Sequence, residues 1–316
     1  MRLLITGGSG LLGANTAKFF SKDNKLNVKV ESRRNFLQLK KQLPFCSFVK
    51  FRWNSKKNDK SKIKKNDIIV HFAGLNSNEC EKNILEARNF NVYETEKLFE
   101  NAIKVGVKKF IFVSTSHVYG EALKNSVDED KIPIPINNYG LLKFITENRL
   151  IDIYKKSNRK TQLIILRVSN VFGAPVFPDT NCWNLVFLDF AKQAATTNKL
   201  IMKGSPKIRR NFLPMSQFLN TLKFIISKKN KSNYELINIG SIWSPTIKEV
   251  AKKFQERARM LYLKDLKIVS LKKNIKKTHK LFYFSKQKKI KKFDKGIKSI
   301  NKEVDSLLKY CFKVFI

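Results

Sequence analysis

The sequence predicts an α/β fold, in which a doubly wound parallel sheet is followed by a smaller C-terminal lobe. Two observations on the 316 residues lead to this prediction. Strands that are apolar throughout alternate with helical segments over the first half of the chain, as in parallel sheets whose two faces are covered by helices. From about residue 174 onward the alternation gives way to a less regular pattern, which indicates a second lobe.

The chain begins with a strand, a glycine-rich turn and a helix. Residues 2–5 form a short apolar run, residues 6–13 read TGGSGLLG, and residues 14–20 can form a helix. This order is typical of the unit that holds a dinucleotide pyrophosphate in Rossmann-type folds. The sequence therefore predicts a dinucleotide site at the start of the chain.

Each glycine of the turn has a physical role in such a unit. Gly7 permits the tight turn, Gly10 lets the backbone approach the phosphates, and Gly13 lets the helix pack closely on the strand. The N–H groups at the start of the helix, where Leu11 and Leu12 stand, attract the anion together with the positive end of the helix dipole.

Further strands and helices follow in alternation. A second strand is expected at residues 26–30, and a polar loop over residues 54–65 precedes a buried strand that ends in Ala73 and Gly74. A long helix is expected over residues 79–105, because its apolar residues are spaced for one helical face. The last expected elements of this half are strands at 109–114 and 162–168 and a helix at 146–155.

The change of pattern suggests how the chain is divided. We expect a dinucleotide-binding domain over residues 1–173, with residues 208–242 threaded back into it and a strand at 235–239. The smaller lobe then comprises residues 174–207 and 243–316, and we expect it to bind the substrate. Its clearest element is a helix at 246–255, capped by Ser244 and Pro245.

Composition narrows the possible classes of protein. No run of eighteen apolar residues appears, which argues against a membrane span, and the first strand begins too early to leave room for a signal peptide. The four cysteines are widely separated and only three histidines are present. We therefore expect free thiols, a cytoplasmic location and no metal site.

The formal net charge of +39 is the most unusual property of the chain. Either it serves a polyanionic partner, such as nucleic acid or an anionic membrane surface, or it reflects a compositional bias that spreads lysines over solvated faces. No basic cluster is arranged as in a recognisable nucleic-acid module. We favour the compositional interpretation and keep nucleic acid as a possible partner.

Two further segments carry reactive groups. Ser114 and Thr115 end a predicted strand, whereas Tyr139 and Lys143 are four residues apart and so lie one turn apart on a helical face. An ammonium beside a phenol favours the phenolate, so Lys143 is expected to lower the pKa of Tyr139 below its ordinary value of about 10. A phenolate takes a proton from a sugar or alcohol hydroxyl as hydride leaves the same carbon, and Thr115 would hold that oxygen.

In this order the motifs resemble those of the extended short-chain dehydrogenase/reductase family, in particular its NAD(P)-dependent nucleotide-sugar epimerases, dehydratases and reductases. The resemblance covers most of the chain, at residues 6–13, 67–74, 91–95, 114–120, 135–143, 166–173, 210–212 and 238–240. It implies a nucleotide-sugar substrate, a homodimer and a role in surface polysaccharide biosynthesis.

The resemblance also implies roles for single residues. Thr115, Tyr139 and Lys143 are similar to the family's catalytic hydroxyl, acid/base and ribose-binding lysine, and Asn91 matches the asparagine that supports the cofactor site. Ala73, Gly74 and Ser114 are expected to contact the cofactor with the glycine turn and with the Tyr–Lys pair.

Asn170 and Arg210 match positions that contact the diphosphate side of the substrate. Each assignment has a structural alternative. Thr115 could only cap a strand end, and Asn170 and Arg210 could be structural loop residues. We interpret His117 as a local hydrogen-bonding residue.

The chain departs from the family pattern at three places. Where the 4,6-dehydratases carry an Asp-Glu pair after the catalytic threonine, this chain has Ser116 and His117, so we expect dehydration to be disfavoured. Asn211 replaces the acidic residue of the Arg-Asp-Phe motif, and the acidic residue usual soon after it is absent from residues 213–217. Asn54 stands where an acidic residue near the adenine is usual.

The choice of cofactor depends on the end of the second strand. If Val28 and Val30 point into the core, the residue that faces the ribose is Ser32, which is followed by Arg33. A serine with arginines would accept a 2′-phosphate and favour NADP. If the register shifts by one residue, Glu31 takes this position and favours NAD. Our expectation is NADP.

These features predict an NAD(P)-dependent epimerase or reductase that acts on a nucleotide-activated sugar through a 4-keto type intermediate. The sequence does not separate the two reactions. The alternatives are a nucleic-acid-binding protein that retains the dinucleotide fold, which the charge suggests, and a cofactor-sensing protein without turnover. The Tyr139–Lys143 pair argues against the nucleic-acid-binding alternative, because a pure binder has no use for it.

Overall fold

The computed structural model describes residues 1–53, 62–123, 125–158, 160–228, 233–271, 281–283, 290, 292–293 and 296–316. Contacts divide the chain into two compact units. The first contains residues 1–122, 129–168 and 223–238, and the second contains residues 123–128, 169–222 and 239–316. Residues 223–238 of the expected return segment 208–242 thus belong to the first unit, and the rest of that segment belongs to the second.

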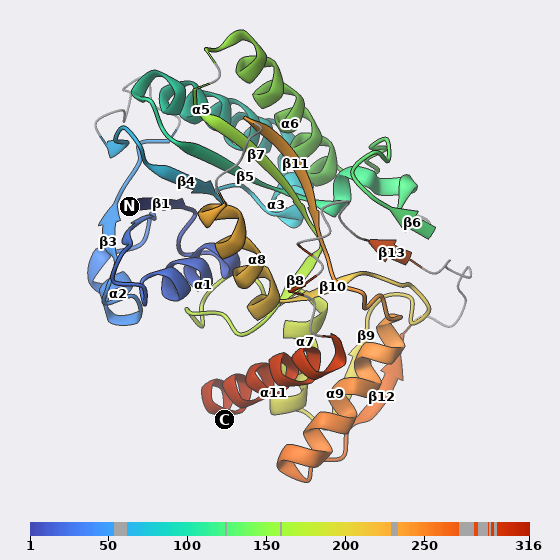
Figure 1. Cartoon of the computed structure of the whole chain (residues 1–316). Helices are drawn as coiled ribbons and strands as arrows, with labels where there is room; N and C mark the ends of the chain where they lie inside the picture. The colour runs from blue at the N-terminus through green and yellow to red at the C-terminus, as the bar shows by residue number, and fades with distance from the viewer. Residues whose placement is uncertain are drawn as a thin grey trace. The chain divides into compact units, whose positions relative to one another are not determined.

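A seven-stranded sheet forms the centre of the first unit, in the order β11-β7-β5-β4-β1-β2-β3 (Figure 1). The strands from β1 to β5 pair in parallel along this order, and β5 pairs in parallel with β7. These strands are β1 (Arg2–Thr6), β2 (Asn27–Glu31), β3 (Ser47–Val49), β4 (Ile68–His71), β5 (Lys109–Thr115), β7 (Gln162–Val168) and β11 (Tyr234–Ile239). The doubly wound Rossmann-type fold expected from the sequence is confirmed.

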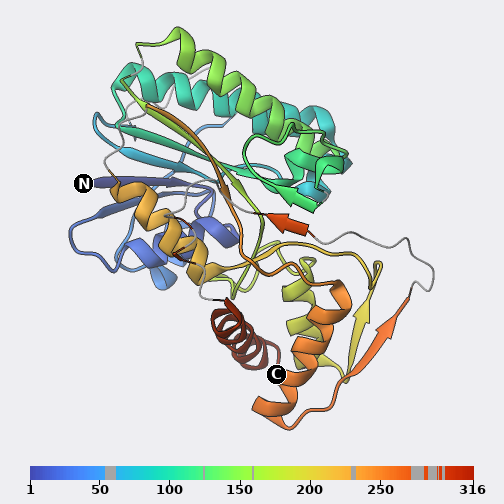
Figure 2. The ribbon, with the colours of Figure 1, turned by 45° about the vertical axis from the view of Figure 1, so that its right-hand side comes forward.

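Helices cover the two faces of this sheet. Helices α5 and α6 lie on one face and α1 lies on the other (Figure 2). The helical segments of this unit are α1 (Leu11–Phe20), α2 (Phe36–Gln42), α3 (Ser77–Lys82), α4 (Ile84–Arg88), η2 (Asn89–Tyr93), α5 (Glu94–Val105), η3 (Ser116–Ala122) and α6 (Asn138–Lys156).

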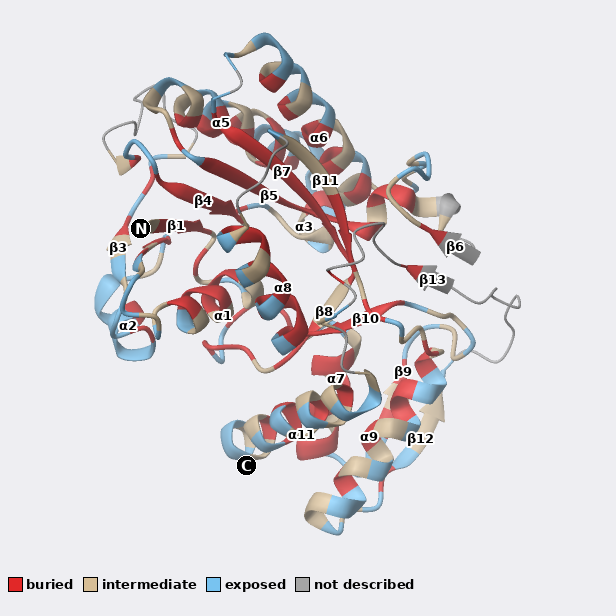
Figure 3. Ribbon diagram, in the orientation of Figure 1, coloured by how far each residue is buried: buried red, intermediate tan, exposed pale blue. Residues whose placement is uncertain are grey.

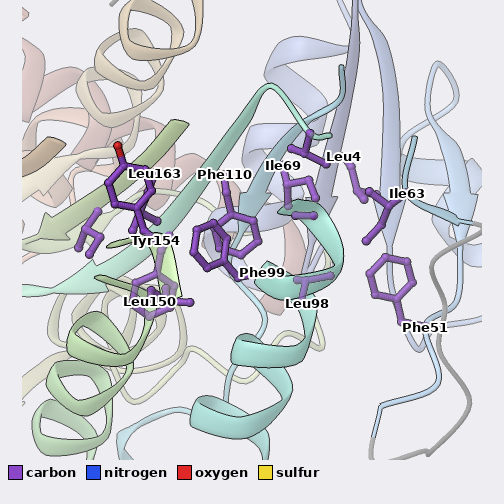
Figure 4. Packing of buried hydrophobic residues seen from close by; sticks show 14 of the residues in the cluster. Leu4, Phe51, Ile63, Ile69, Leu98, Phe99, Phe110, Leu150, Tyr154 and Leu163 are labelled. Atoms are coloured by element: carbon purple, nitrogen blue, oxygen red, sulfur yellow. The ribbon is translucent and has the colours of Figure 1, made fainter. Parts of the chain in front are cut away.

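The core of the first unit lies between the sheet and helices α5 and α6. Phe110 of β5 and Phe99 of α5 meet here with ring centroids 4.8 Å apart, and Leu150 of α6 packs beside them (Figure 4). Strands β4, β5 and β7 are buried along their whole length (Figure 3). This burial explains why they read as unbroken apolar runs rather than as alternating ones.

The helix expected over residues 79–105 is interrupted, which corrects the sequence-based expectation. Asn83 adopts an extended conformation (φ −147°, ψ 91°), and its side chain accepts from the backbone N–H of Glu86 and begins α4. A π-helical turn, η2, then precedes α5. Helical periodicity of the apolar residues continues across these changes, so the sequence pattern could not show them.

In the described residues of the second unit, three pairs of short parallel strands lie beside several helices. The pairs are β8 (Asn170–Phe172) with β10 (Phe212–Pro214), β9 (Lys199–Met202) with β12 (Lys267–Ser270), and β6 (Asn125–Val127) with β13 (Leu281–Tyr283). The helices are α7 (Val186–Thr196), α9 (Ile247–Tyr262), α11 (Gly296–Phe315) and the first part of α8 (Met215–Ser227). Helix α9 is capped by Thr246 through a capping box with Glu249, not by the expected Ser244 and Pro245.

Within the described ranges, no helix is both long enough and apolar enough to span a bilayer. The same ranges contain no group of three or more His, Cys, Asp or Glu side chains arranged to hold a metal ion.

Candidate active site

The glycine turn between β1 and α1 is shaped by close approaches of the backbone. Gly7 has a φ of +66°, and a Cβ atom there would lie 2.7 Å from the backbone nitrogen of Ala73. A Cβ atom on Gly13 would lie 2.3 Å from the carbonyl oxygen of Gly7. Only glycine fits at these two positions, so the turn presents its bare backbone.

The start of α1 leaves backbone donors directed at the turn. The first helical bond runs from the N–H of Ala14 to the carbonyl of Gly10, at 3.0 Å. The N–H groups of Leu11, Leu12 and Gly13 therefore have no acceptor within the helix. Gly10 carries no side chain that could cap them. A cradle of this kind fits a pyrophosphate.

The end of β2 places Glu31, rather than Ser32, against the glycine turn. The Glu31 carboxylate accepts from the backbone N–H of Gly7 and from Nε1 of Trp53, each at 3.0 Å. Ser32 is buried, and its hydroxyl accepts from the N–H of Arg34 at 3.1 Å. Val28 and Val30 do lie in the core, but Glu31 is buried beside them and its carboxylate points to the turn. Arg33 is exposed.

Asn91 of η2 fixes the loop that follows β4. Its Oδ1 accepts from the N–H of Leu75 at 2.6 Å, and its Nδ2 donates to the carbonyl of Leu75 at 3.1 Å. A Cβ atom on Gly74 would lie 3.2 Å from this Oδ1 and 3.7 Å from Nζ of Lys143. Ala73, one residue earlier, donates its N–H to Oγ1 of Thr6 at 3.3 Å. Gly74, Asn91 and Lys143 therefore lie next to one another.

The end of β5 brings Thr115 together with the first two turns of α6. The Thr115 hydroxyl hydrogen bonds to the Tyr139 phenol. Lys143, one turn further along the helix, donates to the carbonyl of Val113 at 3.1 Å and lies 4.8 Å from the ring centroid of Phe112. The expected arrangement of Tyr139 and Lys143 on one helical face is confirmed.

The charge states of this group differ from the sequence-based expectation. Burial of the phenol raises the pKa of Tyr139 to about 12, although the hydrogen bond from Thr115 acts in the opposite direction. Burial also lowers the pKa of Lys143 to about 8. The prediction that Lys143 lowers the pKa of Tyr139 is wrong for this structure, because the ammonium points to Val113 and lies 6.0 Å from the phenol ring centroid.

His117 lies beside Tyr139, with its ring edge-on and the centroids 5.9 Å apart. Its backbone N–H donates to Oγ1 of Thr115 at 3.2 Å. Its Nδ1 lies 3.5 Å from Nδ2 of Asn137, the residue that caps α6 by accepting from the N–H of Gly140. Residue 117 thus takes part in the hydrogen bonding that shapes the site.

Two residues of this region were not identified from the sequence. Glu147 of α6 and Arg167 of β7 form a buried ion pair at 2.7 Å, with Ser114 also donating to Glu147. The available signal was an arginine inside the otherwise apolar run QLIILRV and a glutamate four residues after Lys143.

Asn170 and Arg210 belong to the second unit. The side chain of Asn170 donates to the backbone carbonyl of Asn211 at 2.9 Å. The backbone N–H of Arg210 donates to the carbonyl of Pro245 at 3.1 Å, and the residue is exposed, although burial lowers the pKa of its guanidinium. Asn211 is buried and donates to the carbonyl of Ser241 at 2.7 Å. Asn54 lies outside the described residues.

The sheet, the backbone cradle and the Tyr–Lys helix define a Rossmann-type dinucleotide-binding protein. The chain belongs to the NAD dependent epimerase/dehydratase family, whose model matches residues 3–240. The resemblance to extended short-chain dehydrogenases/reductases seen in the sequence is thereby confirmed.

The individual proteins that the chain resembles are distant from it in sequence. The chain is 27% identical to a dTDP-D-glucose 4,6-dehydratase of Mus musculus over 271 residues, 79% of this chain and 71% of the relative. It is 25% identical to a protein of Bacillus subtilis (strain 168), called an uncharacterized UDP-glucose epimerase, over 81% of this chain and 82% of the relative. A UDP-glucuronic acid 4-epimerase from Bacillus cereus, solved with UDP-glucuronic acid and NAD, has the same fold, with a TM-score of 0.80, 21% identity and coverage of 99% and 100%.

These similarities bear on the expected reaction. The family is one of NAD-dependent epimerases and dehydratases, and several of the similar relatives are dehydratases by name. The expectation that dehydration is disfavoured, drawn from Ser116 and His117, finds no support in them.

Proposed function

We propose that the protein is an NAD-dependent epimerase or reductase of a nucleotide-activated sugar, which acts through a 4-keto type intermediate. The observation that carries this proposal is the contact of Thr115 with Tyr139 at the carboxyl end of β5, with Lys143 one helical turn further along α6 and close to Gly74. Carboxyl ends of parallel strands are where open α/β sheets bind ligands. Surface polysaccharide biosynthesis, a homodimer and a cytoplasmic location belong to the same proposal.

The first unit would hold the dinucleotide. The backbone of Gly7 to Gly13 and the start of α1 would bind the pyrophosphate, and Asn91 would keep Gly74 at the cofactor wall, with Ala73 and Ser114 near it. Lys143 would donate to the nicotinamide ribose. The sequence favoured NADP through Ser32 and Arg33, but the Glu31 carboxylate at the turn supports NAD, because an acidic side chain accepts from a 2′-hydroxyl and repels a 2′-phosphate.

The second unit would bind the substrate, with Arg210 contacting its diphosphate. Arg210 is an exposed residue, whereas Asn170 already donates to Asn211, so Arg210 is the stronger candidate of the two.

Bound NAD supplies a hydride acceptor and, in its reduced form, a hydride donor. Thr115 would orient the substrate oxygen and Tyr139 would exchange its proton. With a pKa of about 12, the phenol is protonated at neutral pH and is ready to donate a proton to a keto oxygen. Proton abstraction by Tyr139 requires additional positive charge near the phenol, since an opposite charge favours the phenolate.

The test is incubation of the purified protein with UDP-glucose, UDP-N-acetylglucosamine and dTDP-glucose, with products followed by NMR. An epimerised sugar supports the proposal, and so does reduction of a nucleotide-activated 4-keto sugar when NADH is supplied as the reductant. A 4-keto-6-deoxy product would show that the protein is a dehydratase despite Ser116 and His117. Tyr139→Phe should lower turnover by at least about a hundredfold, the lower end of what a general acid/base contributes, and should spare NAD binding. Turnover within severalfold of wild type would contradict the role of Tyr139.

A further inference from the structure

Three successive residues of β5 contact three residues of one face of α6. The carbonyl of Val113 accepts from Nζ of Lys143 at 3.1 Å. The hydroxyl of Ser114 donates to the carboxylate of Glu147, and the hydroxyl of Thr115 hydrogen bonds to Tyr139. The helix residues, at 139, 143 and 147, are spaced by four and so share a face. The strand and the helix are thus joined in a fixed register.

Arg167 of β7 holds Glu147 from the other side. Nε of Arg167 donates to Oε2 of Glu147 at 3.1 Å, and Nη2 of Arg167 donates to the same oxygen at 2.7 Å. The arginine thus makes a two-pronged contact with the carboxylate. The remaining guanidinium nitrogen donates to the Tyr119 hydroxyl at 2.9 Å, which in turn donates to Asn238 at 2.9 Å. Arg167 and Ser114 are direct partners across the β5–β7 pair, so both reach Glu147 from adjacent strands.

Burial of the Glu147–Arg167 ion pair costs free energy of desolvation. Glu147 is 1% exposed and Arg167 is 5% exposed. Desolvation of two charges often cancels their attraction, and an apolar pair of similar volume is commonly as stable. Overall stability therefore does not explain a charged pair here. Its position does suggest a role, since Glu147 is one turn from Lys143. Burial lowers the pKa of this lysine, and Cys80 of α3 and the negative charge of Glu147 both act in the opposite direction and favour its ammonium form.

We propose that Glu147 is a positioning residue for Lys143, which fixes the lysine against β5 and keeps its amine protonated in a buried site. The proposal rests on the function proposed above in one respect, the use of Lys143 in the dinucleotide site. Arg167 and Ser114 act through Glu147, because they fix the orientation of its carboxylate.

The test measures the protonation of Lys143 directly, in protein to which no nucleotide has been added. Protein labelled with ¹³C at the lysine Cε is titrated by NMR, and the Lys143 signal is assigned by its loss in Lys143→Arg. The wild-type midpoint is expected near pH 8. In Glu147→Gln it should fall by about one pH unit, because loss of a nearby opposite charge disfavours the charged form. Glu147→Asp, which keeps the charge, should restore at least half of the shift.

Asp67→Asn is the matched control. Asp67 is also a buried carboxylate in a two-pronged contact with an arginine, Arg2, but at the amino end of β1 and β4. The Asp67→Asn variant should lose thermal stability, as Glu147→Gln does, but the pH midpoint of the Lys143 titration should stay unchanged. If Glu147→Gln does not fold, Glu147→Gln with Arg167→Met removes both charges and should also lower the midpoint.

NADH binding, followed by its fluorescence, provides the second measurement. Its alkaline loss should move with the Lys143 midpoint in each variant. A Lys143 midpoint in folded Glu147→Gln equal to that of wild type would overturn the proposal. Failure of the wild type to bind NADH would instead contradict the proposed function, and the NMR titration would still decide the role of Glu147.

Discussion

Lys143 illustrates the conflict between solvation and function at the level of a single residue. Lys143 is 5% exposed. Its ammonium donates to the carbonyl of Val113 and lies over the ring of Phe112. An unfolded lysine has a pKa of about 10.4, whereas burial lowers that of Lys143 to about 8. The folded protein therefore binds this proton less tightly than the unfolded chain does.

Replacement of Lys143 by methionine should stabilise the protein at pH 7. Retaining the proton on a group with a pKa of about 8 costs up to about 3 kcal/mol, offset by about 1 kcal/mol for the lost hydrogen bond. The wild type recovers stability as the pH rises from about 8 to about 10.4, so the advantage of Lys143→Met should shrink over that interval. Urea unfolding at pH 7 and pH 10 measures this. A difference in stability that is independent of pH would contradict it.

Glu31 is expected to set the preference between NAD and NADP. Its carboxylate faces the glycine turn at 3.0 Å, so Glu31→Gln should weaken NADH binding and strengthen NADPH binding. The ratio of the two dissociation constants should change by about tenfold or more, since one charge repulsion of about 1.4 kcal/mol is removed. Titration of NADH and NADPH fluorescence measures the ratio. Arg33→Ala is the opposing variant, since selective weakening of NADPH there would support the NADP expectation.

At the scale of single residues, the sequence predicted which side chains belong to the site better than it predicted where those side chains point. Tyr139 and Lys143 could be paired because they are four residues apart, whereas Thr115 was identified from its place at the end of a predicted strand and from the family resemblance. The direction of Glu31 depends on how β2 ends against the glycine turn. The Glu147–Arg167 pair depends on the pairing of β5 with β7. No local pattern contains that information.

At the scale of elements, α6 carries most of the site, and its first turn decides where Tyr139 lies. The helix begins at Asn138, where Asn137 caps it. Apolar periodicity indicated a start at residue 146, although the spacing of Tyr139 and Lys143 already implied a helical turn before it. An asparagine followed by a tyrosine and a glycine has low helix propensity, so periodicity alone missed the first two turns. The interruption of the helix at Asn83 was also missed. It depends on a cap made by one side-chain hydrogen bond, which the periodicity of apolar residues does not reveal.

Asn137→Ala should affect both stability and turnover. Loss of the cap costs about 1 kcal/mol, and fraying of the first turn displaces the Tyr139 phenol from Thr115. Turnover should therefore fall more than NAD binding does. Thr246→Ala, which removes the cap of α9 in the second unit, is the control, with a similar loss of stability and less loss of turnover. Equal losses of turnover in the two variants would show that the first turn of α6 does not depend on its cap.

At the scale of the whole molecule, charge and fold give different indications. The 64 basic and 25 acidic residues produce a net charge of +39, which attracts any polyanion. Membership of the NAD dependent epimerase/dehydratase family and the contact of Thr115 with Tyr139 indicate an enzyme instead. The two can be separated, because attraction to a polyanion through scattered lysines is sequence-independent and strongly dependent on salt.

We therefore expect RNA binding to be non-specific. With several lysines neutralising phosphates, affinity for RNA should fall by at least about a hundredfold between 50 and 200 mM salt. NADH binding should change far less over this range, since its main contacts are a backbone cradle and few charges. Filter binding with two unrelated RNA sequences, beside NADH fluorescence, makes the comparison. RNA binding that survives 200 mM salt and distinguishes the two sequences would favour the nucleic-acid-binding alternative. Loss of both ligands together would mean that long-range charge, not the glycine turn, holds the dinucleotide.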